Sequence, residues 1–480
     1  MKDFNHFYDQ NKIDAEALVF VDLDQTFIKT DVLWEALLVL MKQKPITLFL
    51  IPFWFLQGRL SFKKKVFSGI EEFQFNLPVN DDVLEVLSYL KGKGHKLIMV
   101  SASLNEIVSR VCERHPIFDE VYGSIDVNLK GKNKADLIVK KAADKEWFYF
   151  GDSTSDIEIW KHANWKVVIS DSQSLIDKMQ SQQSFILPRS KRGIGKLLKK
   201  QLRIHQWAKN ALIFIPLMAS HSFFDSKAWL SSIGTFFAFS FLASSIYVLN
   251  DMMDLSADRL HQVKKHRPLA SGDLSILTGS SVAIALIVSA FVLAALLSPA
   301  LLVILFCYMA LNVFYSFGGK SLLILDVVLL ASMYSMRILA GNAATDIPVS
   351  PWLLGFSTFF FLGLAFMKRT SELVMAPEAL IHGRAYLKSD LPAVLCMGVA
   401  SSLISMLVLV LYFDSEQVRV IYRNSLTLWI MLPLFLYWVC RTWILAFRGE
   451  VSSDPVLYVM KDKISWAILA AIGVIFFFAL

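Results

Sequence analysis

The sequence has little cysteine, and its cysteines do not form a metal-binding pattern. There are four among 480 residues: Cys112, Cys307, Cys396 and Cys440. No two of these cysteines are as close in the sequence as the paired ligands of a zinc site. Three lie in apolar segments, so we expect these cysteines to be small buried hydrophobic residues and not metal ligands.

The N-terminus lacks the apolar core of a secretory signal. Residues 1–16, "MKDFNHFYDQNKIDAE", are mostly polar or charged. A signal peptide needs an apolar run of at least about seven residues. We therefore expect the first domain to remain in the cytoplasm.

Charged residues are scarce, at 19% of the chain, and the formal net charge is +7. A basic excess can indicate nucleic acid binding. Here the basic residues lie mainly between apolar runs, which is typical of the loops of a membrane protein. We expect no nucleic acid partner.

Long apolar runs are missing before about residue 188 and frequent after residue 209. The later runs approach the roughly 20 residues that cross a bilayer core. They lie near 210–223, 229–250, 276–297, 299–316, 322–340, 351–367, 391–413, 424–446 and 464–480. The sequence thus predicts an all-α polytopic membrane domain with nine transmembrane helices, and a lipid bilayer around it.

The loops between these segments differ in charge. With the N-terminus inside, the predicted inner loops hold twelve lysines and arginines and the outer loops hold three. Basic residues favour the cytoplasmic side. We expect a protein of the bacterial cytoplasmic (inner) membrane, with the N-terminal domain and the motif-bearing loops in the cytoplasm.

Composition divides the chain into three regions: a globular domain at 1–185, a basic linker at 186–209 and the membrane domain at 210–480. The linker is partly amphipathic, which fits either a helix lying on anionic headgroups or a solvated charged segment. Residues 31–80 predict a helical cap. The aromatic run at 45–58 in this cap either enters the bilayer interface or packs on the domain core.

Two carboxylates end the first predicted strand, which covers Leu18–Leu23. In "VFVDLDQTFIKTD", Asp22 and Asp24 are two residues apart, so their side chains point the same way. Such a pair can divide the chemistry, with one carboxylate as nucleophile and the other as acid or base.

Further polar residues follow other predicted elements. Ser101 ends a second strand, Asp152 and Asp156 follow a third, and Lys134 begins a helix. The carboxyl ends of parallel strands meet at one edge of a doubly wound sheet. The sequence therefore predicts an α/β doubly wound domain with a Mg²⁺ and phosphate site at that edge.

These ordered motifs resemble those of the haloacid dehalogenase (HAD) superfamily of phosphatases, over roughly residues 15–180. The resemblance implies Asp22 as the nucleophile and Asp24 as the acid and base. It implies further roles for the following residues: Thr26, Ser101 and Lys134 for phosphate, Asp22, Asp24 and Asp152 for Mg²⁺, and Asp156 as support.

One position departs from that family. The glycine that usually follows the second aspartate is Gln25 here. A side chain at this turn could alter the backbone or crowd the site. A domain that keeps the fold but has lost the activity, and serves only as a scaffold, therefore stays an alternative.

A second acidic motif lies in "YVLNDMMDLSADRLHQVKKHRPLASG". If this stretch is helical, Asp251, Asp254 and Asp258 fall on one face, with Asn250 beside them. Carboxylates so close repel each other, and Mg²⁺ carrying a diphosphate would relieve the repulsion. Three basic residues are available for the phosphates from the other side: Arg259, Lys264 and Arg267.

The motif resembles NDxxDxxxD of the UbiA family of intramembrane prenyltransferases, over about residues 200–480. The resemblance implies a transfer reaction carried by Asp251 and Asp254, with Asn250 and Asp258 as further metal ligands. Most members have a second DxxxD motif, but the corresponding loop here, 366–390, has none and offers Lys368, Arg369 and Glu372.

Other stretches, including "RIHQWAKN" and "LDVVLLASMYSMRILAG", resemble the decaprenyl-phosphate phosphoribosyltransferase-like branch of that family. The resemblance implies phosphoribosyl pyrophosphate as donor and a polyprenyl phosphate as acceptor. Arg337, Lys368 and Arg369 would then bind phosphate, with Glu372 in support. Each of these cations could instead be an ordinary charge of a membrane protein.

Our leading hypothesis is a bifunctional enzyme that makes a polyprenyl-linked phosphoribose and then removes its 5-phosphate, with Mg²⁺ in both domains. The first alternative is an aromatic prenyltransferase that uses a polyprenyl diphosphate. The second is a transferase with an inactive HAD scaffold domain. Polyprenyl length and oligomeric state are not encoded in these patterns.

Overall fold

The computed structural model describes residues 2–188, 193–222, 224–375, 385–451 and 454–479. These residues form two compact units. The first comprises Met1–Leu202 and Tyr247–Ala283, and the second comprises Arg203–Ile246 and Ile284–Leu480. The segment that carries the NDxxDxxxD motif therefore belongs to the same unit as the N-terminal domain.

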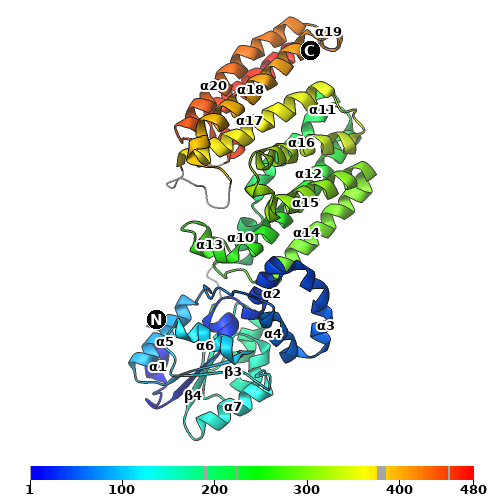
Figure 1. Ribbon diagram of the computed structural model, residues 1–480. Helices are drawn as coiled ribbons and strands as arrows, with labels where there is room; N and C mark the ends of the chain where they lie inside the picture. Colours follow the sequence, from blue (N-terminus) through cyan, green and yellow to red (C-terminus); the bar gives the residue numbers. More distant parts are fainter. Residues whose placement is uncertain (1, 189–192, 223, 376–384, 452–453, 480) are drawn as a thin grey trace. The chain divides into compact units, whose positions relative to one another are not determined.

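The N-terminal domain is built on one six-stranded sheet in the order β3-β2-β1-β4-β5-β6, in which all pairs are parallel (Figure 1). The strands are β1 (Leu18–Val21), β2 (Leu97–Leu104), β3 (Glu120–Ser124), β4 (Trp147–Gly151), β5 (Trp165–Ile169) and β6 (Ser184–Leu187). The predicted doubly wound α/β architecture is confirmed.

Both faces of this sheet are buried, which explains why the strands are apolar throughout. Alternate residues such as Val19 and Val21 pack against one helical layer, and Leu18 and Phe20 pack against the other. The first layer contains α1 (Lys2–Gln10), α5 (Asp81–Gly92) and α6 (Asn105–Glu113). The second contains α7 (Lys132–Ala142), α8 (Ile157–Trp160) and α9 (Gln173–Met179).

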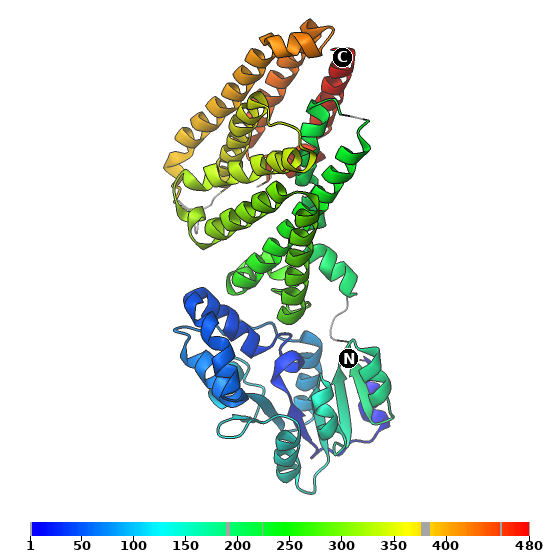
Figure 2. The same cartoon turned by 90° about the vertical axis from the view of Figure 1, so that its right-hand side faces the viewer.

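The predicted cap region is helical. It contains α2 (Val32–Gln43), η2 (Pro45–Leu50), α3 (Ile51–Leu56) and α4 (Arg59–Ser68), which Figure 2 shows as a lobe beside the sheet. Part of its aromatic run does not pack on the core: Phe49 is 79% exposed, Phe53 is 65% exposed and Leu56 is 83% exposed. These exposed side chains are available to a bilayer interface, one of the two environments expected for this run.

The rest of the first unit is helical. It contains α10 (Ile194–Gln201), the end of α12 (Ser226–Met253), α13 (Leu255–Leu260), η5 (Lys264–His266) and the start of α14 (Ile276–Leu297). Leu38 of the cap and Leu198 of α10 pack against a cluster that includes Met252, Leu255 and Leu274. The apolar side of the basic linker thus contacts protein at Leu198; its residues 189–192 lie outside the described residues.

The second unit is a helical bundle whose long helices lie side by side (Figure 2). It contains the remainder of α12 and α14 and the following helices: α11 (Ile215–Ala219), α15 (Pro299–Phe317), α16 (Leu325–Thr345), α17 (Pro351–Met375), α18 (Leu391–Asp414), α19 (Glu416–Ile421), α20 (Met431–Phe447), α21 (Pro455–Lys461) and α22 (Lys463–Ala479). The three cysteines of this unit are exposed on the protein surface, although we expected them to be buried: Cys307, Cys396 and Cys440. Cys112 of the first unit is buried, as expected.

The described residues contain seven helices long and apolar enough to cross a membrane, or eight if the bent pair α21 and α22 is one span. The predicted count of nine is not confirmed. The predicted segment at 464–480 counts as a span only when α22 is joined to the bent α21. The predicted segment at 210–223 is not among the candidate spans, because the chain there forms a 3₁₀ helix, η4 (Ile204–Phe214), followed by the short α11. Pro216 stands in the first turn of α11, where its missing N–H is tolerated but a continuous α-helix is interrupted.

Candidate functional site

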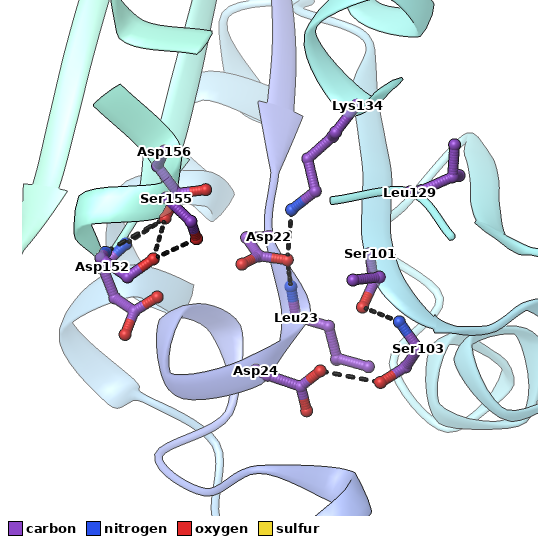
Figure 3. A network of polar contacts seen from close by, with 12 residues as sticks. Asp22, Leu23, Asp24, Ser101, Ser103, Leu129, Lys134, Asp152, Ser155 and Asp156 are labelled. Carbon is purple, nitrogen blue, oxygen red and sulfur yellow. Dashed lines mark hydrogen bonds and ion pairs between the residues drawn. The ribbon is translucent and has the colours of Figure 1, made fainter. Parts of the chain in front are cut away.

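Asp22 lies directly after β1, at the carboxyl edge of the sheet. Its Oδ1 accepts a hydrogen bond from the backbone N–H of Leu23 at 2.9 Å and forms an ion pair with Lys134 Nζ at 2.8 Å (Figure 3). Both side chains are almost fully buried. A carboxylate held in one orientation beside a lysine can attack a phosphorus atom whose oxygens the lysine neutralises.

Asp24 is held by contacts of its own. Its Oδ1 accepts from the backbone N–H of Val32 at 2.8 Å, and its Oδ2 accepts from Ser103 Oγ at 2.8 Å. Figure 3 shows Asp24 and Asp22 extending from the same turn. The structure therefore brings the predicted nucleophile and the predicted acid together.

Gln25 adopts a left-handed backbone conformation, with φ of 57° and ψ of 6°. Glycine reaches this region without strain, whereas another residue pays roughly 1–2 kcal/mol. The backbone N–H of Gln25 still donates to the carbonyl of Thr30 at 3.0 Å. The turn that normally relies on glycine is thus formed here in spite of the side chain.

Asp22, Asp152 and Asp156 each offer a carboxylate oxygen, and these oxygens lie within 4.8 Å of one another. It is the one such group found among the described residues. Hard oxygen ligands are those that Mg²⁺ prefers, so the donor set fits this ion. Asp24 is not in the group, because its carboxylate contacts Val32 and Ser103 instead.

Asp156 also shapes the loop that carries Asp152. Its Oδ2 accepts from the backbone N–H of Asp152 at 3.3 Å and of Ser153 at 3.1 Å, and its Oδ1 accepts from Tyr149 Oη at 2.8 Å. Lys134 Nζ lies 3.1 Å from the same Tyr149 Oη. This chain of contacts fixes the lysine relative to the acidic loop, which agrees with a supporting role for Asp156.

The two predicted hydroxyl ligands differ. Ser101 is fully buried, and its Oγ accepts from the backbone N–H of Ser103 at 3.0 Å. Thr26 is also fully buried, and its Oγ1 has no hydrogen-bond partner. A buried hydroxyl without a partner costs stability, and an oxygen-rich ligand would relieve that cost.

Burial dominates the electrostatics of the two aspartates. It raises the pKa of Asp22 to about 6, and the positive charge of Lys134 opposes this rise. Burial, followed by the charge of Asp31, raises the pKa of Asp24 to about 6. A carboxyl group with a pKa near 6 exchanges its proton close to neutral pH, so it can act first as a general acid and then as a base, which suits the role predicted for Asp24.

Lys63 of the cap is a site residue that the sequence analysis missed. Its Nζ donates to the carbonyl of Ala102 at 2.5 Å and to Asn128 Oδ1 at 3.3 Å. Burial lowers its pKa, while Asp24 and Asp31 favour its charged form. Lys63 is one of three consecutive lysines, and nothing in the pattern distinguishes it from Lys64 and Lys65.

The second acidic motif does not lie on one uninterrupted helix. The helix α12 ends at Met253, and Asp254 precedes α13 with φ of −104°. Asp251 and Asp258 are both buried, and both accept from Arg267 Nη1, at 2.9 Å and 2.6 Å. The structure thus brings these two carboxylates together around one arginine.

The other residues of the motif face different partners. Gln201 donates to Asp251 Oδ2 at 2.8 Å, whereas the half-exposed Asp254 lies 3.6 Å from Lys42 of the cap. Asn250 is half-buried at the end of α12, and Lys264 is exposed in η5. Among the predicted phosphate ligands, Arg267 therefore contacts the acidic motif directly. Within the described part of the chain, no ion pair joins Lys264 to a carboxylate of this motif.

Arg259 contacts the cap and not the acidic residues around it. Its Nη2 and Nη1 bind the two carboxylate oxygens of Glu35 at 2.5 Å and 3.1 Å, and Nη1 also donates to the carbonyl of Asn76. The side chains of Arg259 and Glu35 are 9% and 5% exposed. Glu35, the one acidic residue of the largely apolar helix α2, was the only sequence signal for this pair.

In the second unit, Arg369 is fully buried and its guanidinium binds protein carboxylates. It donates to Asp326 Oδ2 at 2.6 Å, to Glu372, and to Tyr315 Oη at 3.1 Å. The neighbouring Lys368 is half-buried on α17. The predicted support by Glu372 thus takes the form of an ion pair with Arg369.

Arg337, on α16, is also buried within the second unit. Its guanidinium donates to Asn210 Oδ1 at 2.9 Å, to the carbonyl of Met333 and to Tyr308 Oη at 3.2 Å. It also lies over aromatic rings, including that of Tyr334 at 5.2 Å. These contacts hold the helices together, and phosphate binding by Arg337 stays a prediction.

Two protein families match different parts of the chain. The UbiA prenyltransferase family matches residues 211–465, and the haloacid dehalogenase-like hydrolase family matches residues 19–161. The chain belongs to the UbiA prenyltransferase family and carries an N-terminal haloacid dehalogenase-like domain. With its long apolar helices, it is an integral membrane protein.

The chain is 31% identical to the uncharacterized protein y4nM of Sinorhizobium fredii, over 98% of this chain and 93% of that protein. It is 34% identical to decaprenyl-phosphate phosphoribosyltransferase of Mycobacterium tuberculosis, over 37% of this chain and 60% of that protein. A solved UbiA homolog from Archaeoglobus fulgidus, bound to GPP and Mg²⁺, is 16% identical and covers 58% of this chain and 99% of its own, with a TM-score of 0.45.

Proposed function

We propose that this protein transfers 5-phosphoribose from phosphoribosyl pyrophosphate to a polyprenyl phosphate, and that its N-terminal domain then removes the 5-phosphate from the lipid-linked product. Both steps would use Mg²⁺. The observation that carries the proposal is the coexistence, in one compact unit, of a complete phosphatase-type site and the NDxxDxxxD motif.

The transferase half of the proposal rests on the motif and on the relatives. Proteins 34% identical over part of this chain are named decaprenyl-phosphate phosphoribosyltransferase. The second unit also contains a cavity of about 390 Å³ with a largely apolar lining, including Leu212, Phe361 and Ile468, and with Lys209 at its wall. Such a cavity suits an isoprenoid chain with a phosphate end.

In the transfer step, the bond between ribose C1 and the diphosphate oxygen breaks, and an oxygen of the lipid phosphate bonds to C1. The diphosphate leaves with the electron pair. Asp251, Asp254 and Asp258, with Asn250, would hold Mg²⁺, which supplies charge neutralisation at the diphosphate. Arg267 could move from its two carboxylates to the diphosphate once the metal replaces its charge.

In the phosphatase step, an oxygen of Asp22 attacks the 5-phosphorus and the bond to ribose O5 breaks. Asp24 gives its proton to O5, so the sugar leaves as an alcohol. Asp24 then takes a proton from the water that hydrolyses the aspartyl-phosphate. Lys134, Thr26 and Ser101 would hold the phosphoryl oxygens, while Asp22 and Asp152, with Asp156 beside them, would hold Mg²⁺.

Retention of the left-handed turn at Gln25 supports an active phosphatase over a scaffold domain, since the neighbouring Asp22 and Asp24 keep ordered contacts. The location we propose is the inner membrane of a bacterium, with the N-terminal domain in the cytoplasm, where phosphoribosyl pyrophosphate is available. The product would serve cell envelope biosynthesis.

The test supplies membranes containing the protein with Mg²⁺, labelled phosphoribosyl pyrophosphate and a polyprenyl phosphate. The expected result is a lipid-soluble ribose product without the 5-phosphate. A second arm offers a polyprenyl diphosphate and an aromatic acceptor. Absence of any ribosylated lipid, or product in the second arm alone, would refute the phosphoribosyl transfer.

A further inference from the structure

The first unit contains a cavity of about 770 Å³ whose two ends differ in chemistry. One end is lined by the phosphatase residues, including Asp22, Asp24 and Lys134. The other end is lined by apolar side chains. A phosphorylated sugar alone would fill the polar end and leave the apolar end in contact with water.

The apolar end is built from two parts of the chain that lie far apart in the sequence. The cap contributes Leu33, Leu37 and Met41 of α2, and the neighbouring segment contributes Leu249 and Met253 of α12 together with Ile276 and Ser280 of α14. Two of these helices continue as candidate membrane spans. The helix α12, which carries Asn250 and Asp251 of the NDxxDxxxD motif, thus forms a wall of the phosphatase cavity.

Specific contacts fix this wall in place. Lys42 Nζ donates to the carbonyl of Met253 at 3.0 Å. The buried pair of Arg259 and Glu35 joins α13 to α2, and Leu38 of α2 packs into the cluster around Met252. The apolar lining is therefore a built surface and not an accidental gap between two loosely associated segments.

Several side chains of this lining remain accessible. Trp34 is 37% exposed, Leu249 is 40% exposed and Phe55 is 57% exposed. Apolar side chains that stay exposed in a concave site indicate a ligand with apolar surface, because its binding removes both surfaces from water.

We propose that this cavity binds a lipid-linked phosphate ester, with the phosphate that is hydrolysed at Asp22, the group that joins phosphate and lipid next to it, and the apolar chain between the cap and the ends of α12 and α14. The membrane helices of the transferase then complete the substrate site of the phosphatase and select lipid-linked esters over soluble ones. Hydrolysis of the bound ester rests on the proposed phosphatase function, whereas binding of the apolar chain does not depend on it.

The experiment uses the full chain in detergent and a series of alkyl phosphates of about four to ten carbons, each kept below its micelle concentration. Every methylene that enters the cavity should raise kcat/KM about two- to four-fold until the cavity is full. Farnesyl phosphate and dodecyl phosphate distinguish an isoprenoid from a straight acyl-type chain as the preferred occupant.

Two variants at opposite walls test the site, Leu33→Ser in the cap and Met253→Ser at the end of α12. Each variant should at least halve the increase in kcat/KM per added methylene. Two variants are used because local misfolding in one of them would not be shared by the other. The matched control is Leu277→Ser, because Leu277 lies beside Ile276 on α14, is 52% exposed and does not line the cavity. It should keep the wild-type dependence on chain length.

The outcomes separate the two proposals. Hydrolysis that does not depend on chain length, or an equal effect of Leu277→Ser and Met253→Ser, overturns the chain-binding site and leaves the phosphatase intact. If no phosphate is hydrolysed, the phosphatase proposal fails. Equilibrium binding of the matching alkyl phosphonates then tests the chain-binding site. Affinity that rises with chain length in the wild type and in Leu277→Ser, but not in the two wall variants, supports the site. Affinity that does not change with chain length in the wild type overturns it.

Discussion

The two acidic clusters of the first unit compensate their charge in different ways. At the phosphatase-type site, Asp22, Asp152 and Asp156 present oxygens within 4.8 Å of one another, and one lysine pairs with Asp22. In the NDxxDxxxD motif, Asp251 and Asp258 share Arg267, and Asp254 faces Lys42. The first cluster is arranged to receive a metal ion, and the second is neutralised by its own basic residues.

This difference has a physical consequence. Carboxylates that converge without enough positive charge repel one another, so their convergence requires support from the surrounding fold, here the hydrogen bonds of Asp156. Carboxylates already paired with an arginine need no ion for stability. A ligand at the second cluster must therefore displace Arg267 or bind beyond it, which couples substrate binding to a rearrangement of the loop.

The largest expected effect comes from removal of the nucleophile. Asp22→Asn should lower the phosphatase rate at least about 1,000-fold, because the amide neither attacks phosphorus nor binds the metal. The transferase should continue, so a 5-phosphorylated lipid accumulates, which thin-layer chromatography of labelled product would reveal. Asp177→Asn, at an exposed position of α9, is the control. An unchanged dephosphorylated product would contradict the coupling of the two steps.

The next largest effect concerns the buried ion pair between Glu35 and Arg259. Glu35→Gln leaves a buried guanidinium without its counter-charge, and breaking such a pair costs about 3 kcal/mol. We expect the melting temperature of the full chain to fall by several degrees, as measured by thermal unfolding in detergent. Glu85→Gln, at an exposed position of α5, should have almost no effect. Equal stability of both variants would show that the pair contributes nothing to the unit.

The comparison of the clusters is tested directly at Arg267. Arg267→Ala leaves Asp251 and Asp258 close together without a shared cation, and a cost of about 1–3 kcal/mol follows after allowance for the partial exposure of the arginine. Mg²⁺ should restore more stability to this variant than to the wild type, because it replaces the missing charge.

Thermal unfolding with and without Mg²⁺ measures this difference, and Arg267→Lys, which keeps the charge, is the matched variant. The same Mg²⁺ response in Arg267→Ala and the wild type would contradict our view that the arginine takes the place of a metal ion.

The smallest expected effect lies at Gln25. Gln25→Gly removes the strain of the left-handed conformation, but it also increases the entropy of the unfolded chain, so a net stabilisation of about 0.5 kcal/mol is expected. Gln25→Ala keeps the strain and should not stabilise. Chemical denaturation followed at the N-terminal domain can resolve the two, and a loss of stability in the glycine variant would show that the Gln25 side chain makes a favourable contact.

Much of the first domain was predictable from the sequence, because its signals are local. Buried parallel strands appear in the sequence as continuous apolar runs. The candidate site residues follow directly at the ends of these strands, as Asp22 follows β1 and Asp152 follows β4. The membrane segments were predictable for the same reason, except near Pro216, where length and hydropathy suggested a span and the backbone forms short helices instead.

Partners separated by long stretches of sequence were not predictable. Glu35 and Arg259 are 224 residues apart, and no sequence pattern around either residue indicates that they form a pair. Lys63 is one of three consecutive lysines, and the sequence does not distinguish it from the other two. Asp326, the partner of Arg369, lies at the start of an apolar segment and was not predicted as a site residue. Spacing rules describe neighbours on one helix or strand, whereas these contacts depend on how distant elements pack.

The sequence by itself determined the two families, the candidate site residues and the membrane character of the second half. Each of these is encoded in contiguous stretches whose backbone periodicity is fixed by covalent geometry. Only the tertiary structure decided which charges neutralise one another. It placed the NDxxDxxxD segment in the same unit as the phosphatase fold, and it gave the phosphatase cavity an apolar wall made of membrane helices. Those features depend on side chains from distant elements meeting in a buried environment, where an unpaired charge is costly and an exposed apolar surface needs a partner.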